Sequence, residues 1–291
     1  MNKFVKSHGL GNDYIVLDNN NLSFDLTPET TRLICHRNYG IGSDGILLLT
    51  GSGNEGFDLR ILNPDGTEAE KSGNGLRIFS KYLYEHGHTS EESFFINTEG
   101  GKVHSELEIE DGIVKFVTVE MGKVTFNSPE IPVNGEEREV VDEEFRVNGD
   151  IFNITALSVG NPHCVIFTED LDINYVKKVG PLIENNDLFP NRINVQFANV
   201  TSRSSVDILI WERGAGYTLA SGSSSCAVAA ACVKNGLTDS VVKVMMPGGR
   251  LDLEVREDWS IKMKGPVEEV SSGEISADML RNLKNPGTID I

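Results

Sequence analysis

Residues 58–75 read DLRILNPDGTEAEKSGNG, and residues 207–224 read DILIWERGAGYTLASGSS. One offset of 149 residues aligns these two stretches without a gap. The same offset aligns Gly11-Asn12, which opens the apolar run YIVLD, with Gly160-Asn161, which opens PHCVIF. Chance is a poor explanation for matching motifs in one order at one spacing. A unit of about 150 residues is too long for a solenoid, so the sequence predicts two homologous domains related by a pseudo-twofold axis.

The repeat also matches polar positions and indicates domain boundaries. Further downstream, GGKV at 100–103 matches GGRL at 248–251 with the offset shortened by one. We predict a first half of residues 1–120 with the C-terminal segment 277–291, a second half of residues 121–276, and an active site in the cleft between them. The matched pairs are Asn12 with Asn161, Gly45 with Asn194, Asn63 with Glu212, and Ser72 with Ser221.

Each half has the same pattern of secondary structure. Alternating runs such as KVHSELEIE, IVKFVTVEM, SVDILIWE and LDLEVRE are typical of half-buried strands. One convincing helix follows SGNG in the first half, LRIFSKYLYEHG, and another follows SGSSS in the second, CAVAAACVKNG. Gly87 and Gly236 close these helices as C-cap glycines. The second helix is apolar nearly all round, which indicates burial on every side. We predict an α+β fold in which each domain is a mainly antiparallel, β-barrel-like sheet wrapped around a central helix.

Composition excludes several classes of partner. The chain has 291 residues, with 26 basic against 44 acidic side chains, so its formal charge is −18. A nucleic-acid or anionic-membrane partner is therefore not expected. No apolar run reaches the roughly 20 residues of a membrane span, and the N-terminus lacks a signal-peptide core, so we expect a soluble, cytoplasmic protein.

The four cysteines do not indicate a metal site or disulfides. No C-x-x-C pair occurs, so structural zinc is unsupported. Cys226 and Cys232 lie in the Ala-rich helical stretch and are expected to pack as small apolar residues, whereas Cys164 is expected in a buried strand. Disulfides are rare in the expected compartment.

Both predicted helices follow a Ser-Gly pair. The N-terminus of a helix presents free N–H groups and a partial positive charge, which favour an anion. Simple N-capping by serine is the alternative for either helix alone. Because the two loops match within a duplication, we favour two N-termini that converge on one bound anion. Groups on opposite sides of a carbon suit stereoinversion, in which one face loses a proton and the other gains one, while the N-termini stabilise the α-carboxylate.

Seven motifs occur in order along nearly the whole sequence. They are HGLGNDY at 8–14, YGIGSDGILLL at 39–49, NPDGTEAEKSGNGLR at 63–77, SVGNPHCV at 158–165, NRINVQF at 191–197, ERGAGYTLASGSSSCA at 212–227 and PGG at 247–249. Together they resemble the diaminopimelate epimerase family. The family resemblance implies interconversion of LL- and meso-2,6-diaminopimelate by two-base proton transfer at Cα, without cofactor or metal, in a homodimer that acts on a small-molecule amino-acid substrate.

The resemblance also implies roles for individual residues. The proton-transfer groups fall at Ser72 and Ser221, and His163 and Glu212 are the groups that polarise them. Arg213 is independently a natural bidentate partner for a carboxylate. For an isolated asparagine a turn role would be favoured, and for an isolated histidine a structural role. The implied substrate-binding positions are Asn12, Asn63, Gly73, Asn74, Asn161, Asn194, Glu212, Arg213, Gly222 and Ser223.

One departure from the family pattern affects the chemistry directly. The family uses a thiolate and thiol pair, and this chain has serine at both positions. A cysteine thiol has a pKa near about 8.5, lowered at a helix N-terminus, whereas a serine hydroxyl stays protonated at neutral pH. We interpret the pair as an engineered, inactive form that captures intact substrate; a natural serine-based or non-catalytic homologue is the alternative. Ser224 also stands where the family usually has glycine, and Gly45 offers a ligand no side chain.

Three functions remain open from the sequence. The leading one is epimerisation of diaminopimelate. A racemase or epimerase of another amino acid, such as histidine or lanthionine, is the second, and a non-catalytic amino-acid binding protein is the third. Arg213 with three asparagines fits a distal amino-acid group, which favours diaminopimelate or lanthionine over histidine. The double serine is the only feature that favours the binding protein.

Overall fold

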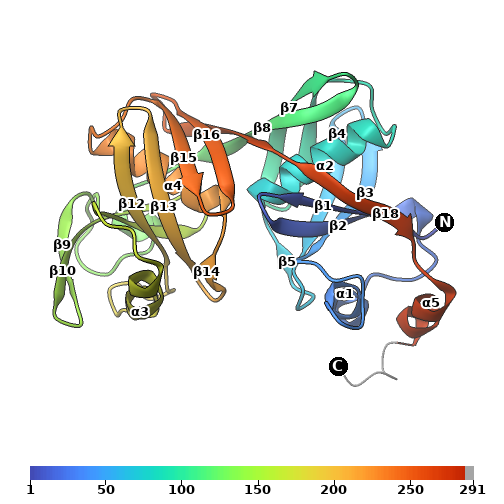
Figure 1. Cartoon of the computed structure of the whole chain (residues 1–291), viewed down its shortest axis with the longest axis horizontal. Helices are drawn as coiled ribbons and strands as arrows, with labels where there is room; N and C mark the ends of the chain where they lie inside the picture. The colour runs from blue at the N-terminus through green and yellow to red at the C-terminus, as the bar shows by residue number, and fades with distance from the viewer. Residues whose placement is uncertain (286–291) are drawn as a thin grey trace. The chain divides into compact units, whose positions relative to one another are not determined.

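The chain forms two compact units. A computed structural model, drawn in Figure 1, describes residues 1–285. Unit 1 comprises residues 1–119 and the segment from residue 265 onward, and unit 2 comprises residues 120–264. The sequence analysis placed the second boundary at 276/277 rather than at 264/265. Residues 286–291 of the predicted C-terminal segment lie outside the described part of the chain.

Within residues 1–285, unit 1 is built from a sheet, three α-helices and one short 3-10 helix. Its strands are β1 (Lys3–Gly9), β2 (Asn12–Asp18), β3 (Ile46–Gly53), β4 (Gly56–Leu62), β5 (Glu68–Ala69), β6 (Ser93–Thr98), β7 (Gly101–Glu110), the first part of β8 (Ile113–Lys123) and β18 (Glu268–Glu274). Its helices are η1 (Asn19–Asn21), α1 (Pro28–Cys35), α2 (Gly73–Glu85) and α5 (Ala277–Lys284).

Unit 2 has a sheet of the same kind. Its strands are β9 (Glu143–Val147), β10 (Asp150–Ser158), β11 (Pro162–Phe167), β12 (Asn194–Ser202), β13 (Ser205–Glu212), β14 (Gly216–Thr218), β15 (Val241–Met246), β16 (Gly249–Val255) and most of β17 (Ser260–Pro266). Its helices are η2 (Ser128–Glu130), α3 (Ile173–Glu184) and α4 (Gly222–Lys234).

The strand registers reproduce the sequence repeat. In unit 1, β2 and β3 are parallel, and β3 runs antiparallel to β4. In unit 2, β11 and β12 are parallel, and β12 runs antiparallel to β13. The offset of 149 carries the pair Ile46–Leu62 onto Val195–Trp211. The parallel pairing of β4 with β6 recurs between β13 and β15. The sequence separation between paired residues is one residue shorter in unit 2 than in unit 1. The predicted duplication, including its slip, is therefore confirmed.

A helix lies at the centre of each unit's sheet. Helix α2 contacts β1, β2 and β7, and α4 contacts β10, β11, β12, β15 and β16 (Figure 1). Because strands approach α4 from several directions, its residues from Ser224 to Cys232 are all buried. All but two strand pairings in each unit are antiparallel. The predicted α+β class with sheet-wrapped central helices is confirmed.

Both central helices begin earlier than the sequence analysis placed them. We expected them to start after the SGNG and SGSSS loops, but they begin at Gly73 and Gly222. Glycine and serine have weak helix propensity, so the first turn resembled a loop. The first N–H groups of a helix have no acceptor within it, and here the preceding serine provides one. Oγ of Ser72 accepts a hydrogen bond from the Gly75 N–H, and Oγ of Ser221 accepts one from the Ser224 N–H. Gly87 and Gly236 follow the helix ends with positive φ, as predicted.

A second helix covers the opposite face of the sheet in each unit. Helix α1 packs on β2 and β3 through a cluster that includes Leu33, Ile34, Ile15 and Ile46. Helix α3 packs on the equivalent strands in unit 2. The sequence analysis had identified only one helix per half. Strands buried on both faces are apolar along their whole length, which explains the continuous runs YIVLD and ILLL.

The strand that closes unit 1 comes from the end of the second half of the sequence. Strand β18 follows β17 in sequence and pairs with β1 in unit 1. Strand β9, in contrast, pairs with its sequence neighbour β10 inside unit 2. The pairing of β18 with β1 explains why the segment from residue 265 belongs to unit 1.

The cysteines occupy the positions predicted for them. Cys164 lies in β11, Cys226 and Cys232 lie in α4, and all four cysteines of the chain are buried and free. Burial raises the pKa of the Cys232 thiol to about 12. Within residues 1–285, no helix has the length and apolar character needed to cross a membrane.

Candidate functional site

The first half of the candidate site lies at the start of α2. Oγ of Ser72 accepts a hydrogen bond from the Gly75 N–H at 3.1 Å and lies 3.2 Å from the Tyr14 hydroxyl. Buried Asn74 donates from Nδ2 to Oδ1 of Asn12 at 3.1 Å. A two-residue turn with positive φ, Leu10-Gly11, separates β1 from β2 and so places Asn12 next to this helix end. The structure thus brings Asn12, Ser72, Gly73 and Asn74 together.

Arg77 orients the amide of Asn74. Its guanidinium is fully buried and donates to Oδ1 of Asn74 at 2.8 Å and to the Gly73 carbonyl at 3.0 Å. Because a guanidinium only donates, the Asn74 amide must present its oxygen to Arg77 and its NH2 group to Asn12. A buried cation one turn inside the helix adds to the positive potential of the helix N-terminus, which favours an anion at this loop.

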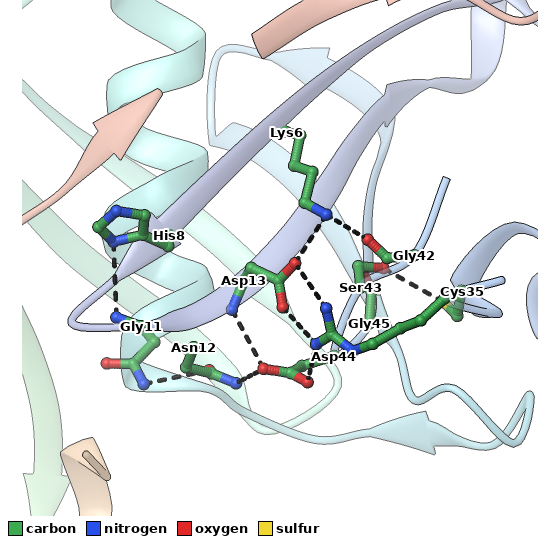
Figure 2. Close-up of polar contacts among 12 residues, drawn as sticks. Lys6, His8, Gly11, Asn12, Asp13, Cys35, Gly42, Ser43, Asp44 and Gly45 are labelled. Atoms are coloured by element: carbon green, nitrogen blue, oxygen red, sulfur yellow. Dashed lines mark hydrogen bonds and ion pairs between the residues drawn. The ribbon is translucent and has the colours of Figure 1, made fainter. Parts of the chain in front are cut away.

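A network of charged groups holds Asn12 from the other side (Figure 2). Asp44 accepts from Nδ2 of Asn12 at 2.9 Å and from the Asp13 N–H at 3.2 Å. Arg37 bridges Asp13 and Asp44 at 2.7 Å each, and Lys6 forms an ion pair with Asp13 at 3.0 Å. Burial works to raise the pKa of Asp13, but hydrogen bonds from Arg37 and Lys6 outweigh it and hold the pKa below its usual range. Asn12 is therefore locked between Asp44 and Asn74.

Replacing Arg37 with methionine should destabilise the protein by roughly 1–2 kcal/mol, because Asp13 and Asp44 lose a shared donor and Lys6 stays paired with Asp13 alone. Urea unfolding at pH 7 measures this loss as a lower midpoint with an unchanged slope. Arg146→Met is the matched control, since Arg146 is exposed and pairs only with exposed Glu144. Equal midpoints for the two variants would show that the bridge does not stabilise this part of the fold.

The second half of the candidate site lies at the start of α4. Ser221 is buried, its Oγ accepts from the Ser224 N–H at 3.4 Å, and it lies 3.5 Å from the Ser223 hydroxyl. Oγ of Ser224 accepts from Nε2 of Gln196 at 3.0 Å. In unit 1 the offset places Gly75 and Leu47 at these two positions, and a Cβ on Gly75 would lie 2.9 Å from Leu47 Cδ2. A hydrogen-bonded pair in unit 2 thus replaces an apolar close contact in unit 1.

His163 is a buried, neutral imidazole. Its Nε2 lies 2.9 Å from Oδ1 of Asn161, and its Nδ1 lies 3.0 Å from Nε2 of Gln196. The amide of Gln196 donates to Nδ1, so Nε2 carries the proton that Asn161 accepts. Complete burial lowers the pKa of His163 to about 3, with Arg213 acting in the same direction and the Gln196 hydrogen bond acting against it. Inside unit 2, His163 reaches the serine loop through Gln196 rather than by direct contact.

Arg213 lies on an anchored turn after β13. Its backbone N–H donates to Oδ1 of Asn194 at 2.9 Å, and Nδ2 of Asn194 donates to the Pro162 carbonyl at 2.8 Å. The carboxylate of Glu184, which is buried, accepts from the Gly214 N–H at 2.9 Å. Asn194 and Glu184 therefore hold the turn, while the Arg213 guanidinium is exposed, with Nη1 donating to the Asn191 carbonyl at 3.0 Å.

Asn63 and Glu212 mark the equivalent ends of β4 and β13. Asn63 bonds within its own turn, with Nδ2 donating to Oγ1 of Thr67 at 3.0 Å and its N–H donating to the Thr67 carbonyl. Glu212 is half-buried and pairs with Gly216 of β14. Hydrogen bonds therefore do not link Asn63 to Asn12 or Ser72 in unit 1.

Several residues that hold this site were not assigned a role in the sequence analysis. Asp44 and Gln196 lie inside the motifs at 39–49 and 191–197, but their contacts with Asn12 and His163 join segments far apart in sequence. Tyr14 did leave a signal, because the offset of 149 aligns it with His163. The Tyr14 hydroxyl contacts Ser72 directly, whereas His163 reaches the second serine loop through Gln196.

The described residues hold no metal-binding cluster, and a cavity in unit 1 is not lined by the serines. In the part of the chain that the structure describes, no group of three or more His, Cys, Asp or Glu side chains is arranged to hold a metal ion. A cavity of about 470 Å³ in unit 1 is lined by residues that include Tyr82, His86 and His88, and by no candidate site residue.

Comparison with known families places this geometry in context. The family model described as diaminopimelate epimerase matches residues 4–127 and 155–270. The chain belongs to the diaminopimelate epimerase family. "Diaminopimelate epimerase 2" of Nostoc sp. is 52% identical over 278 residues, which cover 95% of this chain and 96% of that protein. Diaminopimelate epimerase of Pelotomaculum thermopropionicum is 42% identical over 273 residues, covering 93% of this chain and 98% of that protein.

Solved structures at low sequence identity share the fold. A hydroxyproline epimerase from Agrobacterium vitis superposes with a TM-score of 0.70 at 12% identity, over 94% of this chain and 90% of that one. A PhzF-family phenazine biosynthesis protein of Bacillus anthracis has a TM-score of 0.66 at 16% identity, over 94% of this chain and 98% of that one. The two-unit architecture is therefore shared by proteins with very different sequences.

Proposed function

We propose that this chain is built to bind and epimerise 2,6-diaminopimelate, interconverting the LL and meso forms by proton transfer at Cα. The observation that carries the proposal is the repeated serine loop at a helix N-terminus, in a chain that belongs to the diaminopimelate epimerase family over nearly its whole length. Relatives named for this activity at 52% and 42% identity support the same substrate.

The proposed roles follow the repeat. Positions 72 and 221 act on opposite faces of the α-carbon, and the N–H groups of Gly73, Asn74, Gly222 and Ser223 bind the α-carboxylate. Because the N–H groups of a first helical turn lack partners within the helix, they need no rearrangement to accept an anion. His163 and Glu212 polarise the two proton-transfer positions, and Asn12, Asn63, Asn161, Asn194 and Arg213 hold the remainder of the substrate.

We further propose that the chain with serine at both positions binds substrate without turning it over. The partners of Ser72 in its own unit are the Tyr14 hydroxyl and the Gly75 N–H, and those of Ser221 are the hydroxyl of Ser223 and the N–H of Ser224. None of these groups is a base at neutral pH. We propose that the serine pair replaces natural cysteines; the natural codons at 72 and 221 test this directly.

A non-catalytic amino-acid binding function is the second candidate, and the serine pair is the observation that favours it. It predicts the same ligand contacts but no gain of turnover from cysteine at positions 72 and 221. Racemisation of histidine or epimerisation of lanthionine differs from the leading proposal in the distal group of the substrate. Arg213, with an exposed guanidinium, supports a distal carboxylate over an imidazole.

Three properties are proposed on family grounds. We propose a cytoplasmic homodimer that needs neither cofactor nor metal. Membership of a family of biosynthetic enzymes that act on small molecules supports the location, and the family resemblance supports the dimer. Light scattering on the purified chain tests the dimer, because a single species at the monomer mass of 31.9 kDa contradicts it.

Substrate identity is tested by calorimetry with Arg213→Ala. We expect this variant to bind diaminopimelate roughly thirtyfold more weakly, a loss of about 2 kcal/mol, because a charge-assisted contact to the distal carboxylate disappears. Binding of a monocarboxylic analogue should change little. Arg203→Ala is the control, since Arg203 is exposed in the same unit and bonds to Asp239. Equal losses for both ligands would refute the assigned role, and tighter binding of histidine than of diaminopimelate would refute the substrate.

A further inference from the structure

Tyr14 contacts the proton-transfer position of unit 1 directly. It lies in β2 with only 8% of its surface exposed, and its hydroxyl is 3.2 Å from Oγ of Ser72. The same Oγ accepts the N–H of Gly75 at 3.1 Å. Ser72 is thus held between a helix N–H group and a phenol.

Gly45 makes room for the Tyr14 ring. A Cβ built on Gly45 would lie 2.7 Å from Cε1 and 3.1 Å from Cδ1 of Tyr14, closer than side chains approach one another. In unit 2, the equivalent residues His163 and Asn194 lie opposite each other in register. A large ring beside a bare glycine in unit 1 therefore corresponds to a smaller ring beside an asparagine in unit 2. The missing side chain at position 45 is what lets a phenol reach the serine.

We propose that Tyr14 is a positioning residue for the side chain at position 72 and donates its hydroxyl hydrogen to that side chain. A serine oxygen has two acceptor sites and one hydrogen. With Gly75 N–H and Tyr14 O–H filling both acceptor sites, the Ser72 hydrogen points to the ligand. The inference rests on the proposed function only for the identity of that ligand, an amino-acid carboxylate.

The donor role has a consequence that needs no substrate. If Tyr14 donates to position 72, it stabilises a negative charge there, so a thiolate at that position gains a hydrogen bond that a thiol does not need. If Tyr14 instead accepted the hydrogen from position 72, it would favour the thiol. The pKa of a cysteine introduced at position 72 therefore reports whether Tyr14 donates to the charged side chain.

The test compares Ser72→Cys with Ser72→Cys plus Tyr14→Phe. The alkylation rate with iodoacetamide is measured from pH 5 to pH 10, and the four native cysteines are buried. We expect Tyr14→Phe to raise the pKa of the thiol at position 72 by about one unit. Phenylalanine keeps the ring that fills the space beside Gly45, so packing is preserved.

The matched control is the same Tyr14→Phe change combined with Ser221→Cys. That thiol lies in unit 2, and its pKa should stay unchanged. An unchanged or lowered pKa at position 72 overturns the proposal, and so do equal shifts at both positions, which would report a general loss of structure. Because alkylation involves no amino acid, failure here leaves the proposed epimerase function standing, and an inactive epimerase leaves this inference standing.

Discussion

Ser72→Cys combined with Ser221→Cys should raise the rate of α-proton exchange in LL-diaminopimelate by at least about 10⁴-fold over the chain as written. The reason is protonation chemistry. Each helix N-terminus lowers the pKa of a thiol, so a thiolate forms near neutral pH. The serine hydroxyls instead contact two other hydroxyls and two backbone N–H groups, none of which is a base. Deuterium incorporation at Cα, followed by mass spectrometry in D2O, measures this rate.

An exposed serine provides the control for this experiment. Ser204 lies on the surface of unit 2 beside Ser202, so Ser204→Cys introduces a thiol outside the candidate site. It should leave the exchange rate at the level of the chain as written. If the double revertant folds and binds ligand but stays inactive, the chain is a binding protein. Rapid exchange by the chain as written would refute the proposed inactivity.

The single revertants separate the two proton-transfer roles. Elimination of a β-halogenated diaminopimelate needs one base only, so each single revertant should act on one stereoisomer. We expect Ser72→Cys and Ser221→Cys to prefer opposite isomers, while overall epimerisation stays poor because the far face lacks its acid. Preference of both variants for the same isomer would contradict two bases on opposite faces.

Acidification should destabilise the fold through His163, the second large effect. Burial lowers the pKa of this imidazole from its ordinary value of 6.5 to about 3 in the folded chain. A histidine with a lowered folded pKa contributes stability above its unfolded pKa and loses it as the pH falls through the window from 6.5 to 3. Over the two pH units from 6.5 to 4.5, the free energy of unfolding should fall by roughly 2–3 kcal/mol.

Urea unfolding at several pH values, repeated on His163→Gln, isolates this contribution. The variant loses hydrogen bonds at all pH values, but its free energy of unfolding should fall less on acidification than that of the unchanged chain, by the same roughly 2–3 kcal/mol. NMR of the imidazole nitrogens should show the neutral Nε2–H form down to pH 5. Parallel pH dependences, or a protonated ring at pH 5, would mean that the His163 environment is more polar than the structure has it.

The sequence predicted the serine loops of the site better than the hydrogen bonds that hold the other site residues. Ser72, Asn74, Ser221 and Ser223 lie at helix N-termini as expected, because a serine before a helix has a local signature. Asn194 bonds to the Arg213 backbone, a contact that depends on where two separate segments meet, whereas Asn63 bonds within its own turn. Whether these residues contact one substrate stays a prediction.

The duplication, its slip of one residue, the central helices and the family were readable from the sequence by itself. They leave local marks: a constant offset, strands of period two, C-cap glycines and motifs in a fixed order. Tertiary structure alone decided that β18 pairs with β1 in unit 1, since strand pairing depends on topology and not on composition. It also decided that the ring of Tyr14 fills the space beside Gly45 and reaches Ser72, because only packing shows which side chain occupies the space that a glycine leaves.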